Sequence, residues 1–358
     1  MRIRVSEIVI MYRNHHIGVI VPAYNEEGHV GDVIREMPEF VDRIYAVDDR
    51  STDGTWAEVL DAAETGAGEH SSSGLRTMLT DGGRIANRGS VHERVGQVVP
   101  VRHHENRGAG GSIKTGYLLA LVDGVDITVT VDGDEQMDLG QMTRLLDPIV
   151  EGRVQYAKGN RLLRTKPNRV MPTWRLFGNA VLTVLTSIAS GYWGIMDPQN
   201  GYTAISREAL ETIEVEDLYE YYGYTNDVLT KLNVHNIRVG DVTMKPIYGD
   251  EKSSIVYTEY IPKVSGMLLR NFVWRLQKTN RGWFVHPLAL SYIVGGIASG
   301  LAAAIGVRSL YAHVSRKKGS TERFASSLTL FAVGCLCILF GTVFDIHCNE
   351  EKVVRIHD

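Results

Sequence analysis

Cysteine is scarce in this chain: among 358 residues there are only Cys335, Cys337 and Cys348, all close to the C-terminus. A disulfide framework of the kind found in small secreted proteins is therefore excluded. A strong charge imbalance is also absent, because the formal net charge is −4 and no long basic run occurs. This argues against a protein dedicated to nucleic-acid binding. With 44% hydrophobic and 22% charged residues, the composition also excludes wholesale disorder.

The N-terminus lacks a long apolar segment. The first 16 residues, MRIRVSEIVIMYRNHH, contain neither an extended hydrophobic region nor a small-residue cleavage site. We therefore expect no signal peptide here, and we expect the first 280 residues to remain in the cytosol.

Charge is missing from two stretches near the C-terminus. Residues 282–307 contain no Asp, Glu, Lys or Arg over 26 residues, and residues 325–344 contain none over 20. A membrane-spanning helix needs about 20 apolar residues, so the sequence predicts a transmembrane hairpin with spans at 287–307 and 325–344. Several glycines in each run suit close packing of membrane helices. The alternative is a pair of buried helices in a soluble protein.

The flanking charges conflict with a cytosolic N-terminal part. Segment 270–281 carries four basic residues, segment 308–323 carries five basic and one acidic, and the tail 345–358 carries two basic and four acidic. In a hairpin the first and third segments share one side. The positive-inside rule then slightly favours the other side, that of 308–323, for the cytosol. Charge alone therefore leaves the orientation open.

The first part of the chain alternates predicted strands and helices. Apolar β-rich runs at 17–21, 43–47, 98–101 and 127–131 alternate with helical segments near 28–37, 53–64 and 112–121. This alternation predicts an α/β fold with a parallel sheet covered by helices. Ligands in such sheets bind at the carboxyl ends of the strands. Residues 65–97, which are rich in Gly, Ser and Arg, are expected to form a surface insertion.

Two common nucleotide-binding motifs are incomplete. The glycine-rich stretch at 108–113 lacks the third glycine of a dinucleotide fingerprint, and Lys114 follows Ile113 instead of the glycine that a P-loop requires. A dehydrogenase and a P-loop ATPase are therefore disfavoured.

Acidic residues follow two of the predicted strands. Asp132, Asp134 and Gln136 follow one strand, and Asp48 with Asp49 ends an earlier one on the same expected edge. Two carboxylates and an amide suit Mg²⁺ or Mn²⁺, with a diphosphate completing the ligand shell. The alternative for the Asp132 motif is a solvated turn in which an aspartate caps a helix.

Six segments follow one another at characteristic spacings: VIVPAYNEEGHV (19–30), VDDRSTDGT (47–55), ENRGAGGSIKTGY (105–117), VDGDEQMD (131–138), KGNRLL (158–163) and DPQNGYTAISR (197–207). Their order and spacing resemble glycosyltransferase family 2, in the polyprenyl-phosphate branch that includes dolichol-phosphate mannose and glucose synthases. The resemblance covers about 17–260 and implies a GT-A fold, an α/β nucleotide-sugar-binding domain with a mostly parallel sheet. We expect a catalytic domain at 1–260, a juxtamembrane basic and aromatic segment at 261–286, and the two membrane helices.

The resemblance also implies roles for individual residues. Those expected at the nucleotide are Pro22, Tyr24, Asn25, Glu26, Asp49, Asn106, Gly108 and Asp132. The metal ligands would be Asp132, Asp134 and Gln136. The catalytic set would be Asp134, Asp197, Arg161 and Arg175, in which the arginines bind the acceptor phosphate and Asp197 is the acceptor-side acid.

Some segments depart from the family pattern or stay open. The family often has a basic residue shortly before the segment that corresponds to 246–254. No arginine stands there in this chain, and Lys252 would supply the positive charge. In the preceding helix, Asn226 and Asp227 replace a more usual acidic residue. Segment 174–195 is expected to be an interfacial helix, with a plain buried helix as the alternative. His103 and His104 are interpreted as polar residues at a strand end rather than as metal ligands.

The implied activity is an inverting transfer of a sugar from a GDP- or UDP-sugar to polyprenyl (dolichyl) phosphate, with Mg²⁺ or Mn²⁺ as cofactor. The expected partners are these substrates and the lipid bilayer, without nucleic acid, and a homo-oligomer is left open. The expected location is the cell membrane, multi-pass, with the catalytic domain in the cytosol, where nucleotide-sugars are found. Two alternatives remain: a transferase that extends a membrane-linked saccharide, with Asp197 or Asp227 as base, and a non-catalytic nucleotide-sugar-binding protein. The sugar and the base are not determined.

Overall fold

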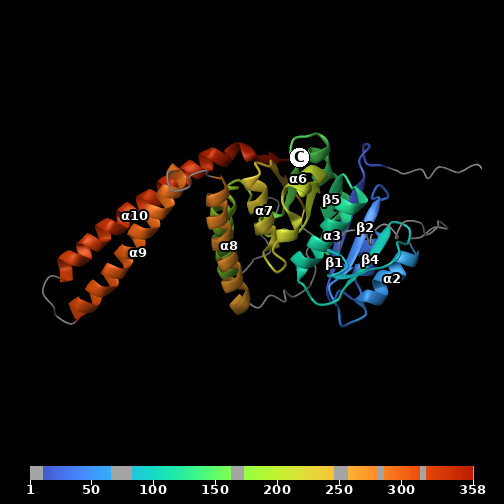
Figure 1. The fold of residues 1–358 in the computed structure, drawn as a ribbon, viewed down its shortest axis with the longest axis horizontal. Helices are drawn as coiled ribbons and strands as arrows, with labels where there is room; N and C mark the ends of the chain where they lie inside the picture. Colours follow the sequence, from blue (N-terminus) through green and yellow to red (C-terminus); the bar gives the residue numbers. More distant parts are fainter. Residues whose placement is uncertain are drawn as a thin grey trace, which may run out of the picture.

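The computed structural model describes residues 11–65, 83–162, 173–245, 257–279, 286–314 and 320–357. Residues 66–82 of the expected insertion and the divergent segment 246–254 lie outside these ranges. The described chain forms an α/β domain from which a two-helix hairpin projects (Figure 1).

A nine-stranded sheet forms the centre of the domain, in the order β3-β4-β2-β1-β5-β7-β6-β8-β9. Five of the eight pairings between these described strands are parallel, and three are antiparallel. The strands are β1 Ile17–Ala23, β2 Arg43–Asp48, β3 Gly89–Val91, β4 Val98–His103, β5 Ile127–Thr130, β6 Tyr156–Asn160, β7 Thr203–Ser206, β8 Val239–Thr243 and β9 Val353–Ile356. The predicted α/β class with a mostly parallel sheet is confirmed.

Helices cover both faces of the sheet. Because successive strand residues point to opposite faces, Val19 and Val21 of β1 lie in one apolar core and Ile20 lies in the other. The first core includes residues of α1, α2 and α4, and the second includes residues of α3, α6 and α7. These helices are α1 Val30–Arg35, α2 Thr55–Thr65, α3 Ala109–Asp123, α4 Met142–Val150, α6 Arg207–Thr212 and α7 Tyr224–Val234.

The central strand β1 brings the acidic motifs to one edge. It pairs in parallel with β2 on one side and with β5 on the other. Asp48 ends β2, Asp49 follows it, and Asp132 comes two residues after β5. The carboxyl ends of parallel neighbours lie at the same edge of a sheet, so the predicted gathering of acidic strand ends is confirmed.

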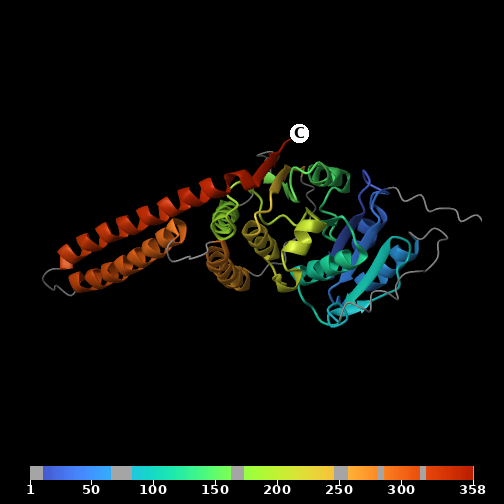
Figure 2. The same ribbon diagram turned by 45° about the horizontal axis from the view of Figure 1, so that its top comes forward.

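Two edge strands were not expected from the sequence. β3 lies inside the segment expected to be a surface insertion and pairs with β4. β9 lies in the C-terminal tail and pairs in parallel with β8, with Val353 opposite Val239. The tail therefore returns from the hairpin to the sheet (Figure 2).

The hairpin consists of α9 (Pro287–Val314) and α10 (Ser320–Asn349), which pack along each other and project from the domain (Figures 1 and 2). Both helices are long and apolar enough to cross a membrane. Only 28% and 17% of their apolar windows are buried, whereas a core helix of a soluble protein is mostly buried. This exposure favours the predicted membrane hairpin over a pair of buried helices.

A buried ion pair joins the hairpin to the domain. Arg275 of α8 (Tyr257–Thr279) donates to both carboxylate oxygens of Asp345 in α10, at 2.9 and 2.8 Å. Its guanidinium also donates to the carbonyl oxygens of Ile188 and Ala189 at the end of α5 (Thr173–Ser190). Both charged side chains are buried. Since a buried charge needs a partner, this contact holds the last turns of α10 against α5 and α8.

Candidate functional site

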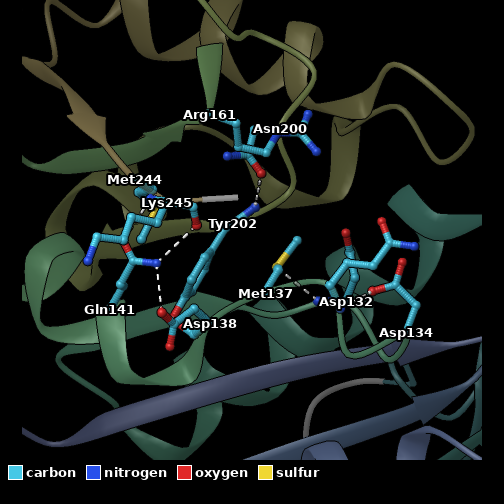
Figure 3. A pocket seen from close by; sticks show the side chains of 11 residues that line it. Asp132, Asp134, Met137, Asp138, Gln141, Arg161, Asn200, Tyr202, Met244 and Lys245 are labelled. Atoms are coloured by element: carbon cyan, nitrogen blue, oxygen red, sulfur yellow. Dashed lines mark hydrogen bonds between the residues drawn. The ribbon is translucent and has the colours of Figure 1, made fainter. Parts of the chain in front are cut away.

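The turn after β5 carries the acidic motif. Gln136 N donates to Asp134 Oδ1 at 3.1 Å, and Glu135 adopts a φ of 57°. Gly133 leaves no room for a side chain without crowding β1, because a Cβ there would come within 3.1 Å of the Pro22 carbonyl oxygen. The turn is therefore compact, and Figure 3 shows Asp132 and Asp134 beside each other at one end of a pocket.

This pocket encloses about 400 Å³, including the open space at its mouth. Asp132, Asp134 and Gln136 line the pocket, and Figure 3 shows the two aspartates on one side of it. The lining also includes Arg161, Asn200 and Lys245, which come from the ends of β6 and β8 and from the loop before β7 (Figure 3). Arg161 and Lys245 bring positive charge to this pocket, and Asp132, Asp134 and Asp138 bring negative charge. Such a lining suits a metal-bound diphosphate beside Asp132 and Asp134 and an anionic group beside Arg161.

Arg161 and Asp197, both expected on the acceptor side, contact each other. Arg161 Nε donates to Asp197 Oδ2 at 2.8 Å, and Nη2 lies 3.3 Å from Oδ1. The Asp197 carboxylate is only 7% exposed, whereas the Arg161 side chain is 46% exposed. The carboxylate therefore holds a guanidinium that still reaches the pocket.

The protein environment opposes the negative charge of Asp132. Burial, followed by the nearby charge of Asp134, raises the pKa of Asp132 to about 7, although Arg161 and Lys158 act in the opposite direction. Lys158 shows the converse effect: burial in β6 lowers its pKa to about 7, despite the carboxylates of Asp197, Asp241 and Asp132. Its ammonium group donates to the Asn200 carbonyl oxygen and so holds the loop before β7.

The donor set fits a hard divalent ion. Two carboxylates and an amide oxygen are the ligands that Mg²⁺ and Mn²⁺ accept, and Mg²⁺ usually completes its shell with water and substrate phosphates. In the described part of the chain, no group of three or more His, Cys, Asp or Glu gathers to form a complete protein cage. Asp132, Asp134 and Gln136 thus form a partial shell, and a cation there would relieve the repulsion between the two carboxylates.

The predicted nucleoside loop at 22–26 is tied to the loop after β2. Asn25 N donates to Ser51 Oγ at 3.0 Å, and Thr52 N donates to Asn25 Oδ1 at 2.9 Å. Glu26 N donates to Thr55 Oγ1 at 2.8 Å. Pro22 is part of β1, and the Tyr24 ring is 48% exposed. These two loops form one unit at the end of the sheet that carries Asp49.

Asp49 is buried and makes several internal hydrogen bonds. Its carboxylate accepts from Arg107 N at 2.8 Å and from Gly108 N at 2.7 Å. Asn106 Nδ2 donates to the Asp49 carbonyl oxygen at 3.2 Å. His103 Nδ1 lies 2.6 Å from Asp49 Oδ1. The structure therefore brings together the predicted residues Asp49, Asn106 and Gly108, and it adds His103, which the sequence marked only as a strand end.

Two other expected residues have different settings. Arg175 lies in the first turn of α5, and the position of its side chain is not among the described features. Asp227, the alternative base, is 3% exposed, accepts from Tyr219 N at 2.9 Å and lies 3.9 Å from Arg270. Asp227 is not among the described residues that line the pocket.

Sequence reasoning missed Lys158, Asn200 and Tyr202. Asn200 donates to the Gly159 carbonyl oxygen at 2.8 Å, and Tyr202 Oη donates to the Asp138 carbonyl oxygen at 3.2 Å. For Lys158, the available signal was a lysine within the short segment YAKGN (156–160), since a buried lysine requires nearby acceptors.

Comparisons with known proteins bear on the family of the chain. The family model described as glycosyl transferase family 2 matches residues 18–214. A UDP-N-acetylglucosamine–dolichyl-phosphate N-acetylglucosaminyltransferase of Methanococcus voltae is 28% identical over 233 residues, which are 65% of this chain and 86% of that protein. An uncharacterised protein of Methanocaldococcus jannaschii is 26% identical over 239 residues, 66% of this chain and 84% of that protein.

Among solved structures, the chain is similar to glucosyl-3-phosphoglycerate synthase from Mycobacterium tuberculosis. In its complex with Mn²⁺, UDP and glucosyl-3-phosphoglycerate, that protein shows 16% identity and a TM-score of 0.48. The match covers 74% of this chain and 80% of the other.

Proposed function

Because the chain belongs to glycosyl transferase family 2, we propose that it transfers a sugar from a nucleotide-sugar to polyprenyl phosphate, with inversion at the anomeric carbon. One observation carries this proposal: Asp132, Asp134 and Gln136 line the same pocket as Arg161. The two carboxylates and the amide suit a metal-bound sugar diphosphate, and the guanidinium suits the oxygens of an acceptor phosphate.

An ionised acceptor would not require either of the two carboxylates considered as bases, Asp197 and Asp227. The two carboxylates considered as bases are already engaged, Asp197 with Arg161 and Asp227 with Tyr219 N. A hydroxyl acceptor would need one of them to remove a proton, whereas a phosphate monoester has a second pKa near 6 and is already ionised at neutral pH. The proposed reaction therefore relies on positioning and charge stabilisation.

One group of residues in the pocket would bind the metal ion, and another would bind the acceptor phosphate. Asp132, Asp134 and Gln136 would hold Mg²⁺ or Mn²⁺, which, when bound, stabilises the departing nucleoside diphosphate as a Lewis acid. Arg161, oriented by Asp197, would hold the acceptor phosphate in the same pocket. Lys158 would keep the loop before β7 in place through the Asn200 carbonyl oxygen.

The first donor to test is UDP-N-acetylglucosamine. The Methanococcus voltae relative is named for this donor and for dolichyl phosphate, and the match spans 86% of its length. We propose the same pair of substrates here. GDP-mannose and UDP-glucose are the competing donors.

The proposed membrane arrangement follows from the two ends of the hairpin. α9 begins close after α8, and α10 leads into β9 on the sheet, so both ends lie on the side of the α/β domain (Figure 2). Helix α5 exposes Val181, Val184 and Leu185, an apolar surface that suits an interfacial helix. We propose that the domain faces the cytosol with its pocket near the membrane surface.

The deciding experiment is a lipid-extraction assay. Membranes containing the full chain would be incubated with Mg²⁺ or Mn²⁺, polyprenyl phosphate and labelled donors. Label from one donor should appear in the organic phase, disappear in Asp134→Asn, and persist in Glu135→Gln. Glu135 is a matched control because it lies in the same turn but contacts His29 on the surface.

Two other results would redirect the assignment. Label that enters only a saccharide acceptor would select the chain-extending transferase. Nucleotide binding without any product, unchanged in Asp134→Asn, would select the non-catalytic binding protein.

A further inference from the structure

A continuous chain of buried polar groups runs from Asp49 to Glu220. His103 Nδ1 lies 2.6 Å from Asp49 Oδ1, and His103 Nε2 lies 2.8 Å from Thr115 Oγ1. Arg88 Nε donates to the same Thr115 hydroxyl at 2.8 Å, and Arg88 Nη1 donates to Glu220 Oε1 at 2.8 Å. Asp49, His103, Thr115 and Arg88 are all at most 7% exposed. Such a chain holds each member in one orientation.

The direction of the His103 contact follows from the partner. A carboxylate oxygen only accepts hydrogen bonds, so His103 Nδ1 donates to Asp49. The contact at Nε2 holds the ring in place from its other side, through Thr115 in the second turn of α3. His103 therefore stands between a helix and the acidic strand end, with both ring nitrogens engaged.

The Asp49 carboxylate in turn holds the loop at 106–108 in place. It accepts from Arg107 N and Gly108 N, the two amides that precede helix α3. The other side of the loop is equally confined, since a Cβ on Gly108 would come within 2.9 Å of the Glu220 carbonyl oxygen. Gly108 has a φ of 74°, which also favours glycine.

The hydrogen bonds from the described residues leave one acceptor position on the Asp49 carboxylate. A carboxylate offers about four lone-pair positions, and donors from the described residues occupy two on Oδ1 and one on Oδ2. An imide N–H of a nucleobase, such as that of uracil, is the kind of donor that would use the fourth. The orientation of Asp49 therefore bears directly on recognition of the nucleoside.

We propose that His103 is a positioning residue that orients the Asp49 carboxylate, and through it the loop at 106–108, for binding of the nucleoside part of the donor. This inference rests on the proposed function in assuming a nucleotide-sugar donor. His103 acts on donor binding and not on the acceptor. It contacts Asp49 in the part of the sheet formed by β2 and β4, whereas Arg161 and Asp197 lie in the part formed by β6 and β7.

The test compares three variants of the full chain. In His103→Asn, the amide N–H can stand where Nδ1 of His103 donates to Asp49. In His103→Gln, the longer side chain places its amide near the position of Nε2 instead. His104→Gln is the matched control, because His104 is the exposed neighbour and contacts only the Ala86 carbonyl oxygen through its ring as described. For the parent protein and each variant, the Kd of UDP and of GDP would be measured by calorimetry, together with KM for donor and for acceptor.

We expect His103→Gln to raise the Kd of UDP and the KM for the donor about tenfold, the effect of losing a charge-assisted hydrogen bond. KM for polyprenyl phosphate should stay within about twofold, since no contact on that side changes. His103→Asn should restore UDP binding to within about threefold of the parent protein, and His104→Gln should match the parent.

The outcomes separate this inference from the proposed function. If UDP binding depends on His103 but no lipid product forms, the inference about His103 holds and polyprenyl phosphate is rejected as the acceptor. Equal UDP binding by His103→Gln and the parent would overturn it. So would a uniform loss of kcat and thermal stability in both His103 variants, which indicates a structural role only. If neither UDP nor GDP binds the parent protein, both proposals fail.

Discussion

Arg161 Nε lies 2.8 Å from Asp197 Oδ2, so two residues that the family resemblance places on the acceptor side form an ion pair with each other. The carboxylate is buried and the guanidinium is half exposed. An aspartate in this position orients the arginine and is a poor candidate for a free base. This pairing supports the proposed phosphate acceptor over a hydroxyl acceptor that needs a base.

The pairing predicts how Asp197→Asn should behave. The variant should raise KM for polyprenyl phosphate about tenfold, because the guanidinium loses its charged partner, while KM for the donor stays within about twofold. Arg161→Lys should show the same pattern, since lysine lacks the planar fork. Steady-state kinetics with each substrate varied in turn would check this. A large loss of kcat with unchanged KM in Asp197→Asn would instead identify Asp197 as a base.

Glu220 should contribute stability that is lost in acid. Burial alone would raise its pKa, but hydrogen bonds from Arg88 and Lys114 outweigh burial and lower the pKa to about 2. A carboxyl group whose pKa is lower in the folded than in the unfolded state stabilises the protein above the unfolded value near 4.5. That contribution declines as the pH falls toward the folded value.

The measurement is the Tm of the parent protein and of Glu220→Gln between pH 7 and pH 3. We expect the parent to melt several degrees higher at pH 7 and the difference to shrink below about pH 4.5. Glu216→Gln, at an exposed ion pair with Arg84, should show a small difference at every pH. A gap between Glu220→Gln and the parent that stays constant with pH would contradict the assignment.

The buried pair of Arg275 and Asp345 should matter more for stability than any surface pair. Removing one partner leaves an uncompensated buried charge, so Asp345→Asn or Arg275→Met should destabilise the protein by about 3–5 kcal/mol. The double variant Arg275→Met with Asp345→Leu should recover part of this loss. Thermal unfolding in detergent would measure each variant. Arg207→Gln, which breaks a surface pair with Glu211, is the control and should change little.

The return of the tail to the sheet predicts where its residues lie relative to the membrane. In a variant without native cysteines, Arg355→Cys in β9 and Arg308→Cys at the far end of α9 should be labelled from opposite sides by an impermeant thiol reagent. With the domain in the cytosol, position 355 should react in inverted vesicles and position 308 in intact cells. Labelling of both positions from one side would refute the spanning hairpin.

Much of the architecture was predictable because it depends on local patterns. Apolar runs such as 17–21 and 127–131 predicted strands, and the structure has β1 and β5 there. Their order predicted a mostly parallel sheet whose acidic strand ends share an edge. The two uncharged stretches predicted helices of spanning length, because hydrophobic length is a property of the chain itself.

The sequence by itself therefore determined the fold class, the apolar hairpin and the types of residue at the acidic edge. Tertiary structure alone decided which of these residues meet: His103 with Asp49 across 54 positions, Arg161 with Asp197 across 36, and Arg275 with Asp345 across 70. It also decided that residues 353–356 join the sheet as β9. The physical reason is that hydrophobic periodicity is set by neighbours along the chain, whereas a hydrogen bond between distant side chains depends on strand register and helix packing.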